Sequence, residues 1–152
     1  MIKTWLITGG SSGFGKAMTK QLLERGNRVV GTVRNRNKIQ DLLTAYPETF
    51  DCELLDVTDV PAVHRIVSTA FEKYGRINVV VSNAGYGLFG CAEELSDAEI
   101  NHILATNLTG SIQLIRSAIP YMRLQGGGRI IQISSYGGQV AYAANSLYHA
   151  TK

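Results

Sequence analysis

The chain has 152 residues, of which 45% are hydrophobic, and its formal net charge is +3. This length corresponds to one domain with an ordinary hydrophobic core. The mild charge includes only a short basic cluster, at Arg34, Arg36 and Lys38, and gives no indication of nucleic-acid or membrane binding. The apolar runs are too short to span a bilayer, and no signal-peptide pattern begins at Met1. We therefore expect a cytosolic protein.

The cysteines and histidines indicate no metal site. Cys52 and Cys91 are far apart in the sequence and fit no metal-binding or redox spacing. His64, His102 and His149 form no ligand spacing either. We expect both thiols to be free and buried, in a reducing compartment.

Short runs rich in Val and Ile alternate with amphipathic segments along the chain. The runs of strand length are TWLIT (4–8), NRVVGTV (27–33), FDCELLDV (50–57), INVVVSN (77–83) and RIIQISS (129–135). The segments between them place apolar residues at helical spacing, as at Val63, Ile66 and Val67. Continuous apolar strands separated by helices predict a parallel sheet covered on both faces, and right-handed crossovers make it a doubly wound, Rossmann-like α/β fold. With no repeat or linker, residues 1–152 are predicted to form one domain.

The longest helical pattern begins near Ser96, whose hydroxyl is predicted to cap the helix in a capping box with Glu99. The pattern predicts a break near residues 107–110 and a continuation to about Gln125. Three glycines, Gly126 to Gly128, then end this helix before the fifth strand.

The segment ITGGSSGFG follows the first predicted strand and precedes a helix. Gly9, Gly13 and Gly15 suit a tight bend in which the backbone approaches an anion at a helix N-terminus. The spacing differs from G-x-G-x-x-G, and such a turn can also be only a turn. The candidate phosphate-binding residues are Gly9, Ser11, Ser12, Gly13, Phe14 and Gly15.

The end of the second predicted strand distinguishes two nicotinamide cofactors. An NAD-binding domain has an acidic residue there to bond the adenosine ribose. Here Val33 and Arg34 occupy this region, and an arginine can bind a 2′-phosphate with charge-assisted hydrogen bonds. This favours NADP over NAD, although Arg34 and Arg36 could also be solvated surface charges.

The last five residues, YHATK, place a tyrosine and a lysine at positions i and i+4. On a helix, Tyr148 and Lys152 would lie on one face. A neighbouring cation lowers the pKa of a phenol and makes it usable as a general acid or base. This spacing alone is common on helices, where the tyrosine usually packs against the protein and the lysine carries a solvated charge.

Four segments in order give the chain a resemblance to the short-chain dehydrogenase/reductase family: TGGSSGFG, NAG at 83–85, TNLTG around Asn107, and ISS followed by YHATK. The resemblance covers the whole chain. Within the family, LDVTD, NAGYGLFG and the second strand with Arg34 look most like the 17β-hydroxysteroid-dehydrogenase-like and retinol-dehydrogenase-like subgroup.

The resemblance implies a catalytic set of Asn107, Ser135, Tyr148 and Lys152. Tyr148 would be the general acid or base, Lys152 would lower its pKa and bond the nicotinamide ribose, and Ser135 would polarise the substrate oxygen. Asn107 would hold open the local helix and a water that links Lys152 to solvent. Ser134 is predicted to be a strand residue, and we assign no catalytic role to His149.

The resemblance also implies cofactor contacts beyond the glycine turn and Arg34. Asp56 and Val57 would contact adenine, and Asn83, Ala84 and Gly85 would close the pocket after the fourth strand. Each of these residues could instead have a purely structural role, as a kink, cap, turn or strand-end residue. The order in which the motifs occur together favours the functional roles. Tyr86, Phe89, Tyr136 and Tyr142 could line a pocket or simply pack.

Family members normally continue past the lysine, with two further strands and a substrate-binding loop. We therefore expect the chain to be part of a longer enzyme, or else a truncated product able at most to bind cofactor. The function implied is NADP-dependent interconversion of an alcohol and its ketone or aldehyde, acting on a small-molecule substrate. A homodimer or homotetramer is implied by the resemblance only. The alternative is a non-catalytic nucleotide-binding regulatory or scaffold module on the same fold.

Overall fold

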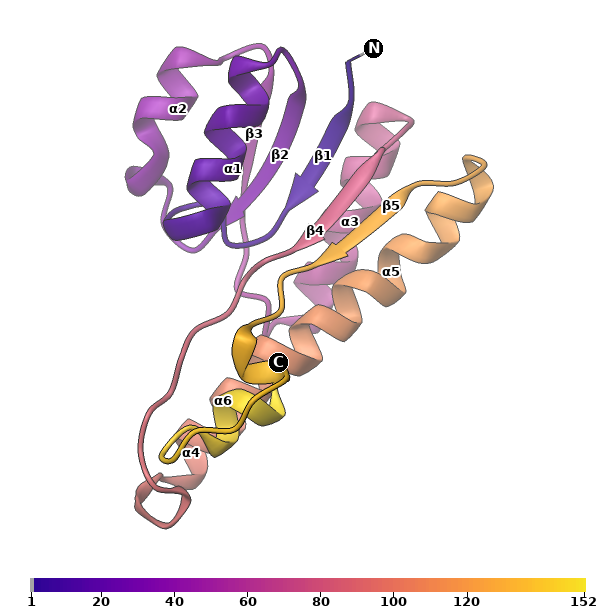
Figure 1. Ribbon diagram of the computed structural model, residues 1–152. Coiled ribbons are helices and arrows are strands. Elements are labelled where there is room, and N and C mark those ends of the chain that lie inside the picture. The colour runs from indigo at the N-terminus through magenta and orange to yellow at the C-terminus, as the bar shows by residue number, and fades with distance from the viewer. Residues whose placement is uncertain (1) are drawn as a thin grey trace.

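Five parallel strands form the centre of the computed structural model, which describes residues 2–152 (Figure 1). They are β1 (Thr4–Ile7), β2 (Arg28–Val33), β3 (Phe50–Leu54), β4 (Val79–Ser82) and β5 (Arg129–Gln132). Their order in the sheet is β3–β2–β1–β4–β5. Leu6 of β1 pairs with Val30 on one side and Val80 on the other. The chain thus builds outward from β1 to β3 and then crosses to the opposite side of β1, which confirms the doubly wound topology.

Helices cover both faces of the sheet (Figure 1). The α-helices are α1 (Gly13–Glu24), α2 (Gln40–Ala45), α3 (Val60–Tyr74), α4 (Asp97–Ile103), α5 (Gly110–Leu124) and α6 (Ser146–Ala150). The short turns of other helix types are η1 (Arg36–Ile39), η2 (Ala92–Glu94), η3 (Leu104–Thr109) and η4 (Tyr136–Gly138). Helices α1 and α2 lie over one face, and α3 and α5 over the other.

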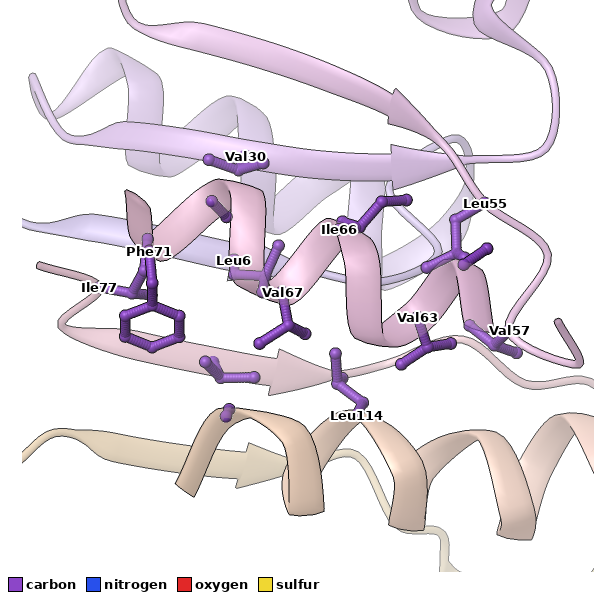
Figure 2. Packing of buried hydrophobic residues seen from close by; sticks show 14 of the residues in the cluster. Leu6, Val30, Leu55, Val57, Val63, Ile66, Val67, Phe71, Ile77 and Leu114 are labelled. Atoms are coloured by element: carbon purple, nitrogen blue, oxygen red, sulfur yellow. The ribbon is translucent and has the colours of Figure 1, made fainter. Parts of the chain in front are cut away.

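Each face has its own buried cluster. On the α3 side, Val63, Val67 and Phe71 recur every four residues along the helix and pack between the sheet and Leu114 of α5 (Figure 2). Asp59 caps the N-terminus of α3 by accepting a hydrogen bond from the Ala62 N–H. On the other face, residues of α1 and α2 pack against the opposite sides of the same strands. Burial on both faces explains why the strands are continuous apolar runs rather than alternating ones.

The segments that follow β4 and β5 leave the sheet together and form an arm, defined here as residues 83–109 and 133–152 (Figure 1). It contains η2, α4, η3, η4 and α6. The predicted capping box at the start of α4 is confirmed, because the Ser96 hydroxyl accepts from the Glu99 N–H while the Glu99 carboxylate accepts from the Ser96 N–H. The predicted break at residues 107–110 is wrong, since η3 is a π-helical segment continuous with α4 and α5. A π-helical turn widens the helix without interrupting it.

The prediction that both cysteines are free is confirmed, but the prediction that both are buried is confirmed for Cys52 alone. Both thiols are free, but Cys52 is buried and Cys91 is exposed. Burial raises the pKa of the Cys52 thiol, against the opposing charge of Arg36. Among residues 2–152, no helix has both the length and the apolar character needed to cross a membrane.

Candidate active site

The candidate residues follow the carboxyl ends of the strands, which all meet at one edge of the parallel sheet. Gly9 follows β1, Arg34 follows β2, Asp56 follows β3, Asn83 follows β4 and Ser135 follows β5. Because β2 and β4 lie on opposite sides of β1, the chain reverses direction across the sheet there. Such a switch point leaves a crevice outside the strand ends, where doubly wound folds bind their ligands.

A pocket of about 610 Å³ occupies this edge. The predicted residues that line it are Gly9, Ser11, Ser12, Gly13, Phe14, Arg34, Asp56, Val57, Asn83, Ala84, Gly85, Ser135, Tyr148 and Lys152. Two predicted residues, Gly15 and Asn107, are not among the residues that line the pocket. The pocket therefore joins the glycine turn at one end to the tyrosine and lysine of the arm at the other.

The glycine turn has a conformation that other residues adopt at a cost. Gly9 and Gly13 have φ angles of +71° and +50°, in the left-handed region that favours glycine. Gly15 is required for a different reason, because a Cβ on it would lie 2.2 Å from the Gly9 carbonyl oxygen. Asn83 closes the turn from the neighbouring strand by donating its amide to the carbonyl oxygens of Thr8 and Gly9, at 2.9 and 3.2 Å.

The turn leads directly into α1, whose N-terminus has no side-chain cap. The N-cap residue, Ser12, makes no capping hydrogen bond, and the first turn of α1 contains no acidic residue. The first backbone N–H groups of a helix lack intrahelical partners, and the helix dipole makes this end positive. The exposed turn at Ser12 and Gly13 therefore suits a phosphate group.

Arg34 and Asp56 lie at the end of the pocket formed by β2 and β3. The Thr58 N–H donates to the Asp56 carboxylate and is the main reason that the pKa of Asp56 is lowered. The Thr58 hydroxyl and the positive charge of Arg34 act in the same direction, against partial desolvation. Arg36, by contrast, donates to the Cys52 carbonyl oxygen and does not line the pocket. Of the two arginines, Arg34 is the one that lines the pocket.

Tyr148 and Lys152 come from α6 and the residues that follow it. The Lys152 Nζ lies 5.8 Å from the centroid of the Tyr148 ring and donates to the Ile133 carbonyl oxygen at 3.3 Å. Ser135 lines the same pocket, and its hydroxyl accepts a hydrogen bond from the Gly137 N–H at 3.1 Å. A phenol, an ammonium group and a hydroxyl thus share one pocket, the set of groups that proton transfer to a polarised oxygen requires.

Asn107 is buried in the π-helical segment, with 2% of its surface exposed. Its Oδ1 accepts from the Tyr86 N–H at 3.0 Å, and its Nδ2 donates to the Tyr86 carbonyl oxygen at 2.8 Å and the Thr151 hydroxyl at 3.1 Å. Each of the two amide hydrogens therefore has a partner. Asn107 connects the segment after β4 to the end of α6.

The structure corrects the prediction for Ser134 and adds pocket residues that the motifs did not indicate. Strand β5 ends at Gln132, so Ser134 lies beyond it, where its hydroxyl donates to the Lys152 carbonyl oxygen at 2.9 Å. Pocket-lining residues without a predicted role include Thr32, Leu55, Gly87, Thr106 and Ile133. Thr106 could have been inferred from its place beside Asn107 in TNLTG. Ile133 acts through its backbone carbonyl, which leaves no signal in the sequence.

The aromatic residues near the arm divide into two groups. Tyr86 and Tyr136 line the pocket, whereas Phe89 and Tyr142 do not. Desolvation raises the pKa of Tyr86, and the negative charge of Glu99 adds to the effect while Arg34 opposes it. His149 accepts a hydrogen bond from the Tyr142 N–H through Nδ1, at 3.3 Å. This hydrogen bond joins the segment before α6 to α6 itself.

Comparisons of the sequence and of the fold with known proteins indicate the same protein family. The family model described as short chain dehydrogenase matches residues 3–152. A 3-ketodihydrosphingosine reductase from Bacteroides thetaiotaomicron is 35% identical over 151 residues, which is 97% of this chain and 52% of the relative. The crystal structure of a short-chain dehydrogenase from Streptomyces avermitilis superimposes with a TM-score of 0.95 and 38% identity, covering 99% of this chain and 56% of that one.

A second solved structure, ElxO with NADP bound, superimposes with a TM-score of 0.91 and 32% identity. The match covers 99% of this chain and 62% of the ElxO chain. The chain spans about half the length of the curated relatives that it matches. Because the family match covers nearly the whole chain, and the fold and motif order agree with it, the chain belongs to the short-chain dehydrogenase family.

Proposed function

We propose that residues 1–152 form the cofactor-binding and proton-transfer domain of an NADP-dependent oxidoreductase that interconverts an alcohol and its ketone or aldehyde. The observation that carries this proposal is the shared pocket. Its walls combine an uncapped helix N-terminus and Arg34 at one end with Ser135, Tyr148 and Lys152 at the other. A module that only bound a nucleotide would have no use for the second group.

The residues of the pocket fit NADP in three ways. The glycine turn and the N-terminus of α1 offer backbone N–H groups to the pyrophosphate. Arg34 pairs with the 2′-phosphate, which favours NADP over NAD. Lys152 hydrogen-bonds the nicotinamide ribose. When bound, the cofactor supplies or accepts a hydride at the substrate carbon.

The chain's own groups handle the proton and the substrate oxygen. The Ser135 hydroxyl donates to the carbonyl oxygen and stabilises the negative charge that develops on it. In reduction, the Tyr148 hydroxyl gives its proton to that oxygen; in oxidation, Tyr148 takes the proton from the alcohol. Lys152 brings a positive charge close to this phenol, with its Nζ 5.8 Å from the centroid of the Tyr148 ring.

The substrate side of the proposal is an uncharged carbonyl compound with a large apolar body. Residues 83–92 and 133–151, which follow β4 and β5 into the arm, contain no Asp, Glu, Lys or Arg. Tyr86 and Tyr136 contribute aromatic surface to the pocket. This agrees with the 17β-hydroxysteroid-dehydrogenase-like or retinol-dehydrogenase-like subgroup as our proposal.

A single substitution separates catalysis from cofactor binding. We expect Tyr148→Phe in the full-length protein to reduce NADPH-dependent turnover of a carbonyl panel by about 10²- to 10⁴-fold, because the general acid is lost. NADPH binding, measured by cofactor fluorescence, should change little, since the ring remains. The control is Tyr142→Phe, which removes the same hydroxyl outside the pocket. Undiminished turnover in Tyr148→Phe would contradict the assignment, and NADPH binding without any wild-type turnover would favour the non-catalytic module.

A further inference from the structure

Helix α6, which carries Tyr148, is joined to the rest of the arm by side-chain hydrogen bonds. It spans Ser146–Ala150, and Thr151 and Lys152 follow it directly. These contacts determine how Tyr148 and Lys152 are directed into the pocket.

Thr151 makes the contact that links this segment to the interior of the arm. It is 6% exposed, and its hydroxyl donates to the Tyr148 carbonyl oxygen at 2.8 Å. The same hydroxyl accepts from Asn107 Nδ2 at 3.1 Å. One buried oxygen thus joins the backbone of Tyr148 to a side chain from the π-helical segment.

Because of its position in the sequence, Thr151 can fix the rotation of α6 about the helix axis through its hydrogen bond with Asn107. Successive residues of a helix are about 100° apart, so Tyr148 and Lys152 share one side while Thr151 faces inward beside them. Holding Thr151 therefore holds the rotation of the segment about its axis. Ser134 and Ile133 contact Lys152, and the Tyr142 N–H donates to His149. Among these hydrogen bonds, those of Thr151 are the ones that join the Tyr148 backbone to Asn107.

The same link extends to the opposite wall of the pocket. Asn107 holds both the N–H and the carbonyl oxygen of Tyr86. A Cβ on the neighbouring Gly85 would lie 3.1 Å from Asn107 Oδ1 and 3.3 Å from Lys152 Nζ. Gly85, Asn107 and Lys152 are therefore packed closely, and a shift of one requires a shift of the others.

We propose that Thr151 is a positioning residue of the reaction, whose hydroxyl aligns Tyr148 and Lys152 by coupling them to Asn107 and the Tyr86 backbone. The inference rests on the proposed function for its effect on turnover, but the physical coupling exists independently of it. Proton transfer depends on geometry closely enough that a displacement of about 1 Å can cost about a hundredfold in rate.

The test compares Thr151→Val, which keeps the shape and removes the hydroxyl, with Thr151→Ser, which keeps the hydroxyl. A matched control is Thr19→Val, because Thr19 is also buried but its hydroxyl has no hydrogen-bond partner within residues 2–152. We expect Thr151→Val to lower kcat by about tenfold to a hundredfold at saturating NADPH. Thr151→Ser should restore most of the rate, and Thr19→Val should leave it unchanged.

A second readout does not depend on activity. The Tyr86 N–H donates to Asn107, so its amide hydrogen exchange reports the strength of the coupling. We expect about fivefold faster exchange at Tyr86 in Thr151→Val, from the loss of one hydrogen bond, and near wild-type exchange in Thr151→Ser and Thr19→Val.

The outcomes separate the two proposals. If wild type shows no NADPH-dependent turnover, the proposed function fails, and the exchange rates at Tyr86 still decide the coupling. If wild type turns over and Thr151→Val matches it, the positioning role is overturned. Equal impairment of Thr151→Ser and Thr151→Val would also overturn it, because the hydroxyl would then not be the operative group.

Discussion

The two ends of the pocket are held in different ways. The cofactor end is built on strand ends: Gly9, Arg34 and Asp56 follow directly from β1, β2 and β3, whose backbones are paired along their length. The arm end has no such support. Tyr148 lies on α6 and Lys152 two residues beyond it, and this segment is joined to the arm by hydrogen bonds of Thr151 with Asn107 and of Lys152 with Ser134 and Ile133.

This difference shows how each end of the pocket positions its functional groups. At the cofactor end, chain direction and glycine conformation place backbone groups, and a residue's place in the sequence determines its role. At the arm end, side chains distant in sequence must meet, as Asn107 and Thr151 do. We therefore expect substitutions at the cofactor end to affect folding and affinity, and those in the arm to affect alignment and rate.

The largest effect is expected from Gly15→Ala at the cofactor end. The new Cβ would lie 2.2 Å from the Gly9 carbonyl oxygen, so the turn and α1 must separate, at a cost of about 3 kcal/mol. Denaturant unfolding should show this loss, together with loss of NADPH binding. Gly10→Ala is the matched control, because its nearest neighbour would be 3.7 Å away. Equal stability of the two variants would show that the turn is more adaptable than its geometry indicates.

The next effect concerns the choice of cofactor. Arg34→Ala should weaken NADPH binding by about tenfold to a hundredfold, the contribution of charge-assisted hydrogen bonds to one phosphate. NADH binding should stay nearly the same, because NADH lacks that phosphate. Arg36→Ala serves as the control, since Arg36 bonds the Cys52 carbonyl oxygen outside the pocket. Equal weakening of NADH and NADPH by Arg34→Ala would contradict a role in 2′-phosphate recognition.

A gain in stability is expected from Thr19→Val. The Thr19 side chain is fully buried in α1, and no residue between 2 and 152 pairs with its hydroxyl. Replacing an unsatisfied buried hydroxyl by a methyl group of the same shape should raise the free energy of unfolding by about 1 kcal/mol. Thermal or denaturant unfolding measures this directly. A loss of stability would mean that the hydroxyl has a partner, and would remove Thr19→Val as a control for Thr151.

The smallest effect is expected in the arm. Ser134→Ala removes the hydrogen bond to the Lys152 carbonyl oxygen, an exposed contact whose loss should leave global stability within about 0.5 kcal/mol. Amide exchange in residues 146–152 should nevertheless rise, because this hydrogen bond joins the segment to Ser134. Exchange at the cofactor end should stay the same. A rise at both ends would show that the two regions are less independent than described.

The sequence predicts the fold well because its signals are local. Apolar runs, the glycine turn and the Ser96–Glu99 capping box each act within a few residues, and the strands and α4 form where these signals lie. The gathering of Arg34, Asp56 and Asn83 follows from the rule that parallel strands end at one edge. The strand boundaries were less predictable, as Ser134 shows.

The arm was less predictable because its contacts are not local. Nothing within TNLTG indicates that Asn107 bonds Thr151, or that the helix widens into a π-helical turn instead of breaking. Backbone contributions such as the Ile133 carbonyl oxygen are independent of residue type. The exposure of Cys91 also depends on where the segment after β4 leaves the sheet, which composition does not determine.

The central claim is that the pocket at the strand ends binds NADP, and titration of this chain with NADPH and NADH at fixed salt tests it most directly. Cofactor fluorescence and thermal shift should show saturable binding of NADPH, tighter than that of NADH by about tenfold or more, because Arg34 recognises the 2′-phosphate. NADH binding as tight as NADPH binding, or binding of neither cofactor, would contradict the account.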